Sequence, residues 1–329
     1  MHNYFLIKPE QIKLSLTNVC NYRCVMCYNP GLKQKRGFMK DDLFYKILDE
    51  CQHNGIQRIS LGSSGEALLH KNYLAYLRAA KKQNLWTSTT SNCTRLTPEM
   101  SDAIINENLL DRFNISVYSS TASEHKKYTG SDSFDLVYNN IKYFLECWGR
   151  SKRTIQLNMW FLQLPDINNY NEYKKLWGPI ADQVGLELPL KKPINWSGLT
   201  SVPGKKRKKQ KCFIEKSDGQ YLLNLERKVR CQHIRSYFYI LHDGTVVPCC
   251  NIPEPRNNKE IVFGDIHNDT LMAIWNSDRY RKFKRSLYNH DTSLYGPCRR
   301  CSELKEYSKI RLSLTDFPQR CIKYLKSIL

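Results

Sequence analysis

The chain has 329 residues, of which 51 are Lys or Arg and 31 are Asp or Glu, so its formal net charge is +20. This length allows one large domain, a smaller second one and a sizeable buried core. The absence of an 18-residue apolar run and of a charged-then-apolar leader argues against membrane spanning and secretion, so we expect a cytoplasmic protein. In such a chain, 13 cysteines indicate metal or redox chemistry rather than disulfides.

The first half of the chain predicts an α/β fold. From residue 11 to about residue 190, short β-rich runs alternate with amphipathic helical stretches, which indicates βα units and a parallel sheet. The six expected strands are 12–19, 58–62, 85–90, 113–118, 154–161 and 185–190. The helical stretches between them are 41–51, 73–80, 98–105, 136–147 and 170–184, and Asp41 is the expected N-cap of the first. Right-handed crossovers would curl these strands into a partial (β/α)6 barrel, similar to a TIM barrel.

Three cysteines follow the first strand. Cys20, Cys24 and Cys27 are separated by three and then two residues. A cubic iron–sulfur cluster has four irons, so three thiolates leave one iron free to bind a small molecule. A structural zinc site is the alternative, but it needs a fourth ligand, and no Cys or His lies just downstream of Cys27.

This cysteine spacing resembles the signature of the radical S-adenosylmethionine (SAM) superfamily. The resemblance implies that the amino and carboxylate groups of SAM chelate the open iron of a [4Fe–4S] cluster held by Cys20, Cys24 and Cys27. It further implies that the reduced cluster cleaves SAM and that a 5'-deoxyadenosyl radical abstracts hydrogen from the substrate. An external one-electron reductant would supply the electron, while the protein orients the reactants and excludes water.

The same resemblance suggests where SAM binds. The loop after the second strand, 62–67, departs from the family's Gly-Gly-Glu-Pro at two positions but keeps a small residue and a carboxylate that can accept bonds from an ammonium. The ends of the third and fourth strands lie where family members often contact the ligand, and a Met before the third cysteine could pack on adenine. The implied SAM contacts are Met26, Ser64, Gly65, Glu66, Ser91, Asn92 and Ser116.

Substrate contacts are less defined. Tyr118 occupies a place that the family commonly gives to Asp, so it either faces the substrate or packs on its neighbours. On the fifth strand, Gln156, Asn158 and Trp160 alternate with Leu157 and Met159, and the sequence does not decide which set points into the barrel. Cys93, after the third strand, is either a buried apolar residue or a thiol that returns hydrogen to a substrate radical.

The pattern changes after about Trp196. A basic run at 204–211 lacks apolar periodicity and aromatic residues, which favours a solvated linker over a nucleic-acid contact. We therefore predict a barrel domain at 1–196 and a second domain at 197–329. The last residues, 309–329, mix apolar and basic side chains and predict a helical tail that docks on the barrel rather than on a membrane surface.

The second domain contains its own set of cysteines. The run 237–248 reads as two strands around Asp243-Gly244, a strong hairpin signal. The hairpin, a Gly-Asp-Ile turn and an Ile-Trp-Asn-Ser helix resemble the SPASM and shorter twitch extensions of radical SAM enzymes. The resemblance implies one auxiliary [4Fe–4S] cluster, which would support the fold, carry electrons or anchor substrate. Its ligands would be Cys231, Cys249, Cys298 and Cys301, with Cys250 as the alternative to Cys249 and a zinc ribbon as the alternative site.

These features predict a radical SAM oxidoreductase or epimerase. By analogy with relatives of similar organisation, its substrate would be a polar small molecule, phosphorylated or carbohydrate-like, which the positive charge would suit. One alternative is a maturase that modifies a ribosomally made peptide. The other is a non-catalytic, metal-stabilised nucleic-acid-binding protein, which the +20 charge allows but which we do not favour.

Overall fold

The computed structural model describes residues 8–31, 33, 35–159, 161–162, 168–186, 213–217, 220–228, 231, 233–249, 259–289, 295, 298 and 305–312. It divides the chain into two compact units. The first combines Met1–Thr200 with Gln232–Lys284, and the second combines Ser201–Cys231 with Arg285–Leu329. The predicted boundary at 196/197 and the basic run at 204–211 lie outside the described residues and stay predictions.

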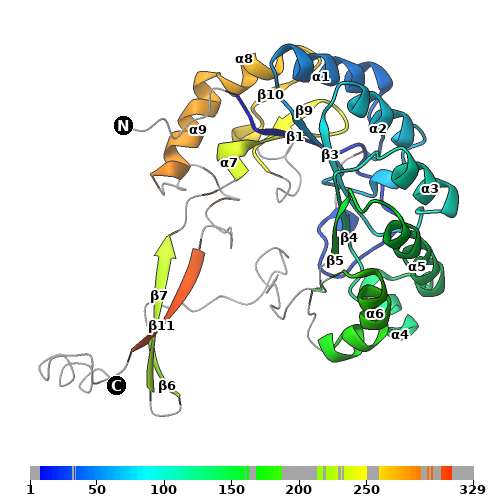
Figure 1. The fold of residues 1–329 in the computed structure, drawn as a ribbon. Coiled ribbons are helices and arrows are strands. Elements are labelled where there is room, and N and C mark those ends of the chain that lie inside the picture. The colour runs from blue at the N-terminus through cyan, green and yellow to red at the C-terminus, as the bar shows by residue number, and fades with distance from the viewer. Residues whose placement is uncertain are drawn as a thin grey trace, which may run out of the picture. The chain divides into compact units, whose positions relative to one another are not determined.

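The first unit is built on an eight-stranded sheet with the order β10-β9-β8-β1-β2-β3-β4-β5 (Figure 1). Its strands are β1 (Gln11–Leu14), β2 (Arg58–Leu61), β3 (Trp86–Ser91), β4 (Arg112–Ile115), β5 (Gln156–Met159), β8 (Tyr237–Ile240), β9 (Thr245–Val247) and β10 (Gly264–Asp265). Strands β1 to β5 pair in parallel with their neighbours, as the alternating pattern predicts. The α/β fold and five of the six expected strands are therefore confirmed. Of the sixth, only residues 185 and 186 are described, and there Gly185 ends a helix.

Helices follow the convex side of this arc of strands (Figure 1). They are α1 (Asp41–His53), α2 (Tyr73–Lys82), α3 (Pro98–Asn106), α4 (Ala122–Thr129), α5 (Phe134–Arg150) and α6 (Tyr170–Val184). The apolar face predicted for α1, including Cys51, is buried. The expected N-cap is wrong by one residue, since Lys40 is the N-cap and makes no side-chain bond to the helix. Asp41 instead accepts hydrogen bonds from Tyr76 and Asn72, which tie α1 to α2.

The two faces of the sheet differ in chemistry. Ile12, Ile59 and Phe113 are fully buried on the helical side, where the Phe113 ring lies edge-on to Phe144 of α5 at 5.1 Å. Because side chains alternate along a strand, the residues between them point to the opposite, helix-free face. The apolar core therefore lies between the sheet and the helices.

The predicted hairpin is confirmed, and it has a second role that the sequence did not reveal. Strands β8 and β9 pair antiparallel around a turn that contains Gly244. At this glycine φ is +85°, and a Cβ would lie 2.8 Å from Asp265 Oδ1, so the turn requires glycine. β8 also pairs in parallel with β1, from Gln11 opposite Tyr237 to Leu14 opposite Ile240. The hairpin thus extends the sheet of the barrel.

The segment after the hairpin packs on α1. It includes α8 (Leu271–Trp275) and leads into α9 (Asp278–Tyr288), while α7 (His233–Ser236) precedes β8. Lys46 Nζ donates to the Ile266 carbonyl at 2.5 Å, and the Leu271 amide donates to Glu50 Oε2 at 2.5 Å. These contacts join the β10–α8 segment to the first helix of the barrel.

The second unit contains a three-stranded antiparallel sheet of β6 (Phe213–Ser217), β7 (Gln220–Lys228) and β11 (Lys305–Leu312), in the order β11-β7-β6. The helical tail predicted from residue 309 is wrong for its first four residues, because Lys309–Leu312 belong to β11. Ile310 and Leu312 recur at a spacing of two, which suits a strand. The rest of the tail, 313–329, lies outside the described residues. Across the part that the structure describes, no helix has the length and apolarity to span a bilayer.

Candidate active site

The three cysteines of the first motif lie in the long loop between β1 and α1. Cys20 and Cys24 are partly exposed and Cys27 is exposed, and all three are free thiols. Burial raises the pKa of Cys20 to about 11 and that of Cys24 to about 12, and the charge on Cys27 contributes to both shifts. All three cysteines lie in this one loop, and their assignment as cluster ligands stays a prediction.

The surroundings of the sulfurs fit an iron–sulfur cluster. The Tyr22 amide points at Cys20 Sγ at 3.5 Å, and the Asn29 amide points at Cys27 Sγ at 3.4 Å. Within the described ranges, no three His, Cys, Asp or Glu side chains lie close enough to share one metal ion. A cubic cluster bonds each thiolate to a different iron, and thiolates are its usual ligands. Three partly exposed thiols with amide donors match that ligand type.

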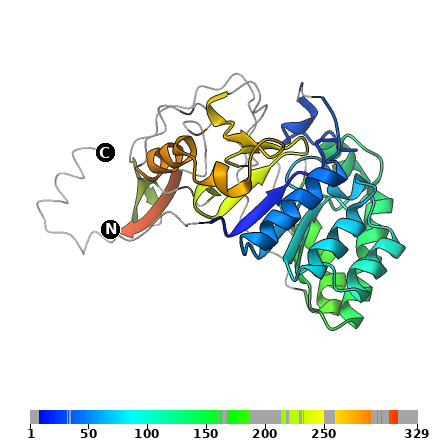
Figure 2. The same ribbon diagram turned by 90° about the horizontal axis from the view of Figure 1, so that it is seen from above.

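The start and the end of the loop between β1 and α1 are bonded to each other. Arg36 donates from Nη1 to the Asn18 carbonyl and to Asn29 Oδ1, both at 2.5 Å, and from Nη2 to the Asn29 carbonyl at 2.6 Å. Phe38 forms an isolated antiparallel bridge with Thr17. These bonds fix both ends of the cysteine segment. Figure 2 shows this loop, in dark blue, standing clear of the helical layer.

Tyr22, between the first two cysteines, anchors the loop on its inner side. Its hydroxyl pairs with His125 Nε2 at 2.9 Å and with Ser133 Oγ at 2.8 Å. The other ring nitrogen of His125 pairs with Ser119 Oγ at 2.9 Å. Burial lowers the pKa of His125 to about 4, so the ring is neutral. The sequence analysis missed His125 because no local motif marks a residue whose partner lies 103 positions away.

Glu66 joins the loops that follow β1, β2 and β3. Its side chain is 3% exposed, and its amide donates to the Val19 carbonyl at 2.8 Å. Oε1 accepts from the Leu68 amide and the Ser91 hydroxyl, and Oε2 accepts from the Asn92 amide. Burial raises the pKa of Glu66, while these three bonds act in the opposite direction. Three of the predicted SAM contacts, Glu66, Ser91 and Asn92, thus lie together.

Gly65 allows this close approach. Its φ is +66°, and a Cβ would lie 2.5 Å from the Val19 carbonyl oxygen and 2.7 Å from that of Thr17. The next residue back, Ser64, is partly exposed. Gly65 is therefore required by contact with the cysteine loop itself, a reason that the sequence analysis did not identify.

The end of β3 also reaches the cysteine loop. Asn92 Nδ2 donates to Asn21 Oδ1 at 3.0 Å, and Asn21 Nδ2 donates to Thr94 Oγ1 at 2.7 Å. Cys93, between them, is fully buried with φ at +63°. Its carbonyl accepts a hydrogen bond from Asn140 of α5, which holds this turn against the helix. The buried position matches an apolar role for Cys93 rather than contact with a substrate.

The remaining predicted SAM contacts form a second group. Ser116 Oγ pairs with the Tyr118 hydroxyl at 2.8 Å, and the Tyr118 ring lies edge-on to Tyr128 at 5.2 Å. Met26 and Cys24 pack against the same buried Tyr128, together with Leu162. Tyr118 therefore packs on its neighbours and also links Ser116 to the cysteine loop.

The helix-free face of the sheet is polar, which settles the orientation of β5. Leu157 and Met159 are buried on the helical side. Asn158 points the other way and donates to Asn114 Oδ1 at 2.9 Å, and Asn114 donates to Thr90 Oγ1 at 3.1 Å. Trp160 lies outside the described residues.

A row of polar residues crosses this face. The register aligns Lys13, Ser60, Ser88 and Arg112 across β1 to β4. Lys13 Nζ lies 4.0 Å from the centroid of the Tyr237 ring. Strands β1 to β5 carry Lys13, Arg58 and Arg112 but no Asp or Glu. The sheet therefore presents positive charge and hydrogen-bonding groups on the side away from the helices.

The second cysteine set is described in part. Cys249 follows β9 in the first unit, whereas Cys231 and Cys298 belong to the second unit, and all three are partly exposed. Cys301 and Cys250 lie outside the described residues. The four predicted ligands and the choice between Cys249 and Cys250 therefore stay predictions.

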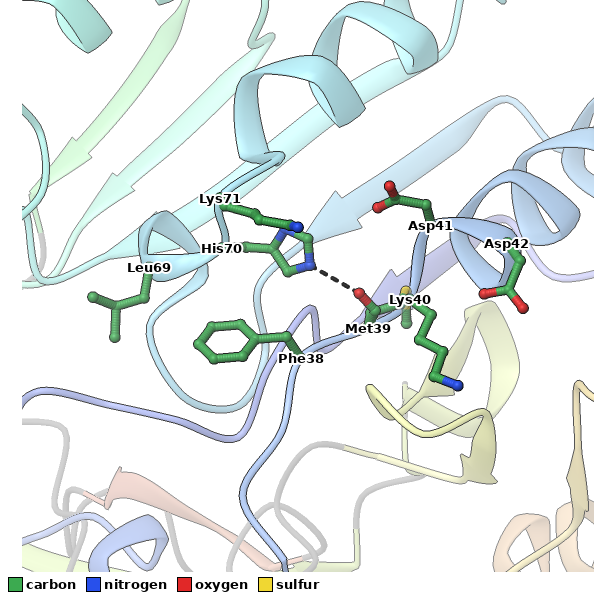
Figure 3. A pocket seen from close by; sticks show the side chains of 8 residues that line it. All are labelled: Phe38, Met39, Lys40, Asp41, Asp42, Leu69, His70 and Lys71. Carbon is green, nitrogen blue, oxygen red and sulfur yellow. Dashed lines mark hydrogen bonds between the residues drawn. The ribbon is translucent and has the colours of Figure 1, made fainter.

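A separate cavity of about 510 Å³ opens between the start of α1 and the short helix η2 (Ala67–Leu69). Figure 3 shows its lining, Phe38, Met39, Lys40, Asp41, Asp42, Leu69, His70 and Lys71. His70 accepts from the Asn72 amide at Nδ1, so Nε2 carries the proton and donates to the Met39 carbonyl. None of the predicted cluster or SAM contacts lines this cavity.

Comparison with known proteins identifies the family. Residues 14–157 match the model of the Radical SAM superfamily, and residues 231–302 match SPASM, an iron-sulfur cluster-binding domain. The chain belongs to the radical SAM superfamily. The first match contains Cys20, Cys24 and Cys27, and the second contains Cys231, Cys249, Cys298 and Cys301. The predicted family, its SPASM extension and the [4Fe–4S] clusters and SAM that these domains imply are confirmed.

Three known proteins are similar to this chain, one in sequence and two in structure. A tungsten-containing aldehyde ferredoxin oxidoreductase cofactor-modifying protein of Pyrococcus furiosus is 25% identical over 320 residues, which cover 89% of this chain and 87% of the relative. The structure of Streptococcus suis SuiB bound to the precursor peptide SuiA has a TM-score of 0.61 at 15% identity, over 85% of this chain and 67% of SuiB. BtrN in complex with AdoMet and 2-DOIA has a TM-score of 0.51 at 16% identity, over 84% and 86%. The two solved structures establish a common fold with this radical SAM protein.

Replacement of Gly65 by Ala should destabilise the protein and displace the cysteine loop. We expect a loss of more than about 1 kcal/mol, because alanine must adopt a positive φ and its Cβ would overlap two carbonyl oxygens. Urea unfolding followed by circular dichroism measures the change. Gly31→Ala is the control, because it lies in the same loop with nothing within 4 Å of the added Cβ, and it should change stability by less than about 0.5 kcal/mol. Equal unfolding midpoints for the two variants would contradict the account of Gly65.

Proposed function

We propose that this chain is a radical SAM enzyme that cleaves SAM reductively at a [4Fe–4S] cluster held by Cys20, Cys24 and Cys27. The observation that carries the proposal is the convergence of loops on this motif. The Val19–Cys27 segment is bonded to Glu66 after β2 through Val19, to Asn92 after β3 through Asn21 and to His125 of α4 through Tyr22. Cluster and SAM together supply a 5'-deoxyadenosyl radical, which abstracts hydrogen from the substrate.

Each group of contacts has a role in holding SAM. A carboxylate has about four lone-pair sites, and Glu66 uses three of them for protein donors, which leaves capacity on Oε2 for the amino group of SAM. Gly65 and Ser64 complete that loop, and Ser91 and Asn92 fix the carboxylate. Ser116 and Met26, linked through Tyr118, offer a hydroxyl and a thioether to the nucleoside part of SAM.

The auxiliary cluster is assigned to Cys231, Cys249, Cys298 and Cys301. All four lie in the SPASM match, and four thiolates leave no iron open for substrate. We therefore give this cluster a role in structural support or electron transfer. The electrons that start the reaction come from an external one-electron reductant.

The substrate that this site suits is polar and negatively charged. The helix-free face carries Lys13, Arg58 and Arg112 without a strand carboxylate, beside the amide ladder of Asn114 and Asn158. Hydroxyl-rich or phosphorylated metabolites match these groups, so we propose oxidation or epimerisation of such a molecule.

A peptide maturase is the second candidate. It is favoured by the structural similarity to SuiB, whose structure contains a bound precursor peptide. A non-catalytic nucleic-acid binder has less support, because the net charge of +20 serves an anionic small substrate equally well.

Iron analysis tests the two cluster assignments. Anaerobically reconstituted protein should contain about eight irons per chain, and a Cys20/Cys24/Cys27→Ala triple variant about four, because the auxiliary cluster is independent of the first motif. The same samples, with dithionite and SAM, should form 5'-deoxyadenosine in the wild type and none in the variant. Equal iron contents, or zinc in place of iron, would contradict the assignment.

A deuterium-transfer experiment separates the two substrate classes. Cells grown in D2O provide a small-molecule fraction and a peptide fraction, each of which is added to wild-type protein with unlabelled SAM. Deuterium should enter 5'-deoxyadenosine from the small-molecule fraction. Asn114→Leu should reduce that transfer while SAM cleavage without substrate persists, because this residue contributes to the helix-free face. Deuterium from the peptide fraction alone would favour the maturase.

A further inference from the structure

The cysteine loop carries positive charge and no negative charge. Between β1 and α1, residues 15–40 include five Lys or Arg and no Asp or Glu. All five are exposed: Arg23, Lys33, Lys35, Arg36 and Lys40. Arg23, Lys35 and Lys40 form no ion pair with another described residue. Because the loop stands clear of the helical layer (Figure 2), a partner protein can reach these charges.

An exposed apolar side chain lies between two of the proposed cluster ligands. Val25 directly follows Cys24, precedes Cys27 by two residues and is 54% exposed, the largest fraction among the exposed large apolar side chains that the structure describes. Its neighbour Met26 is partly buried and packs on Tyr128. Cys27 is exposed as well. A protein that covers Val25 therefore lies against the segment that holds the proposed cluster.

Helix α4 adds positive charge beside Val25. The Val25 amide donates to the Tyr128 carbonyl at 3.0 Å, and the Arg23 amide donates to the Thr129 carbonyl at 2.8 Å. Lys127, the residue before Tyr128, is exposed and makes no ion pair within the described part of the chain. The last turn of α4 thus brings an exposed lysine next to the Val25 backbone.

The turn that follows Cys27 supplies further basic residues. The Asn29 amide points at Cys27 Sγ at 3.4 Å. Arg36 donates to Asn29 Oδ1 at 2.5 Å and to the Asn29 carbonyl at 2.6 Å, and these bonds close the turn from 29 to 36. Lys33 and Lys35 lie within this turn and are exposed. Exposed basic residues therefore both precede and follow Cys27.

We infer that this part of the molecule is the docking site of an acidic protein that carries a one-electron cofactor. We call it the Val25 surface and define it by Arg23, Val25, Lys33, Lys35 and Lys127. The inference rests on the proposed function, in which the cluster of the cysteine loop receives its electron from outside. The carrier loses one electron and the cluster gains it, so no other reactant is needed. Complexes that transfer electrons bury less than about 1,200 Å², so a surface of this size suffices.

The chemistry of the Val25 surface favours an electron carrier over a nucleic acid. Its positive charge attracts either partner. Surfaces that bind single-stranded nucleic acid add aromatic side chains on which bases stack, and the Val25 surface contains none. Its apolar centre lies between two cluster ligands, where a carrier needs close contact and a phosphate backbone gains nothing.

Charge reversal tests the docking without any reaction. Oxidised acidic ferredoxin and flavodoxin are titrated into the anaerobic holoprotein at low salt, and calorimetry gives each Kd. Lys127→Glu and Val25→Asp should each raise Kd by about fivefold, because a repulsion replaces a favourable contact. Lys152→Glu is the matched control and should leave Kd unchanged, since Lys152 is exposed and precedes β5, at the edge of the sheet opposite the cysteine loop. Failure of both carriers to bind, or equal Kd values for Lys127→Glu and Lys152→Glu, would overturn the inference.

A kinetic comparison separates docking from damage to the cluster. With carrier that has been reduced in advance and freed of excess reductant, Lys127→Glu should form 5'-deoxyadenosine from SAM about fivefold more slowly than the wild type. With dithionite, a small reductant that needs no docking surface, the two rates should be equal. Equal losses with both reductants would overturn the inference. Wild-type protein that forms no 5'-deoxyadenosine with dithionite would instead contradict the proposed function, so the two failures are distinguishable.

A nucleic-acid control completes the test. A labelled single-stranded oligonucleotide should bind Lys127→Glu and Lys152→Glu equally, because it responds only to net charge. Weaker binding of the oligonucleotide to Lys127→Glu alone, with unchanged binding of both carriers, would assign the Val25 surface to nucleic acid and overturn the inference.

Discussion

The site depends on one buried carboxylate. Glu66 receives hydrogen bonds from its own loop and from the end of β3, and its amide holds Val19 beside the first cysteine. Burying a carboxylate is costly unless donors compensate it, and three donors do so here. The neighbouring Gly65 permits the contact, since any side chain there would overlap the cysteine loop. The loops after β1, β2 and β3 are therefore held together, and this arrangement sets the position of the cysteine loop.

A second constraint acts from the other side. While Glu66 holds the residues before Cys20, α4 holds Tyr22 to Val25 through His125, Tyr128 and Thr129. The cysteine loop has little regular secondary structure of its own, so its conformation comes from these two supports. Both supports are placed at the carboxyl ends of parallel strands, where the βα loops of a barrel meet. The strands of the barrel thus position the loops, and the loops carry the residues proposed to bind the cluster and SAM.

The sequence predicted what depends on local pattern or on a family motif. Five parallel strands, the apolar face of α1 and the hairpin at Gly244 follow from spacing and residue type. The grouping of Glu66 with Ser91 and Asn92 follows from the family resemblance. The pairing of β8 with β1 and the bonds of His125 did not follow, because each joins residues far apart in the chain and leaves no local signal. Lys309–Leu312 were assigned to a helix because apolar and basic residues mixed in that tail fit either period.

The central claim is that the three cysteines hold a cluster whose open iron binds SAM. The most direct test is EPR of the reduced holoprotein before and after addition of SAM, with electron–nuclear double resonance on SAM labelled with 15N at its amino group and 17O at its carboxylate. The account predicts that SAM changes the cluster signal and that both labels show hyperfine coupling to it. A signal that SAM leaves unchanged, with no coupling to either label, would contradict the account.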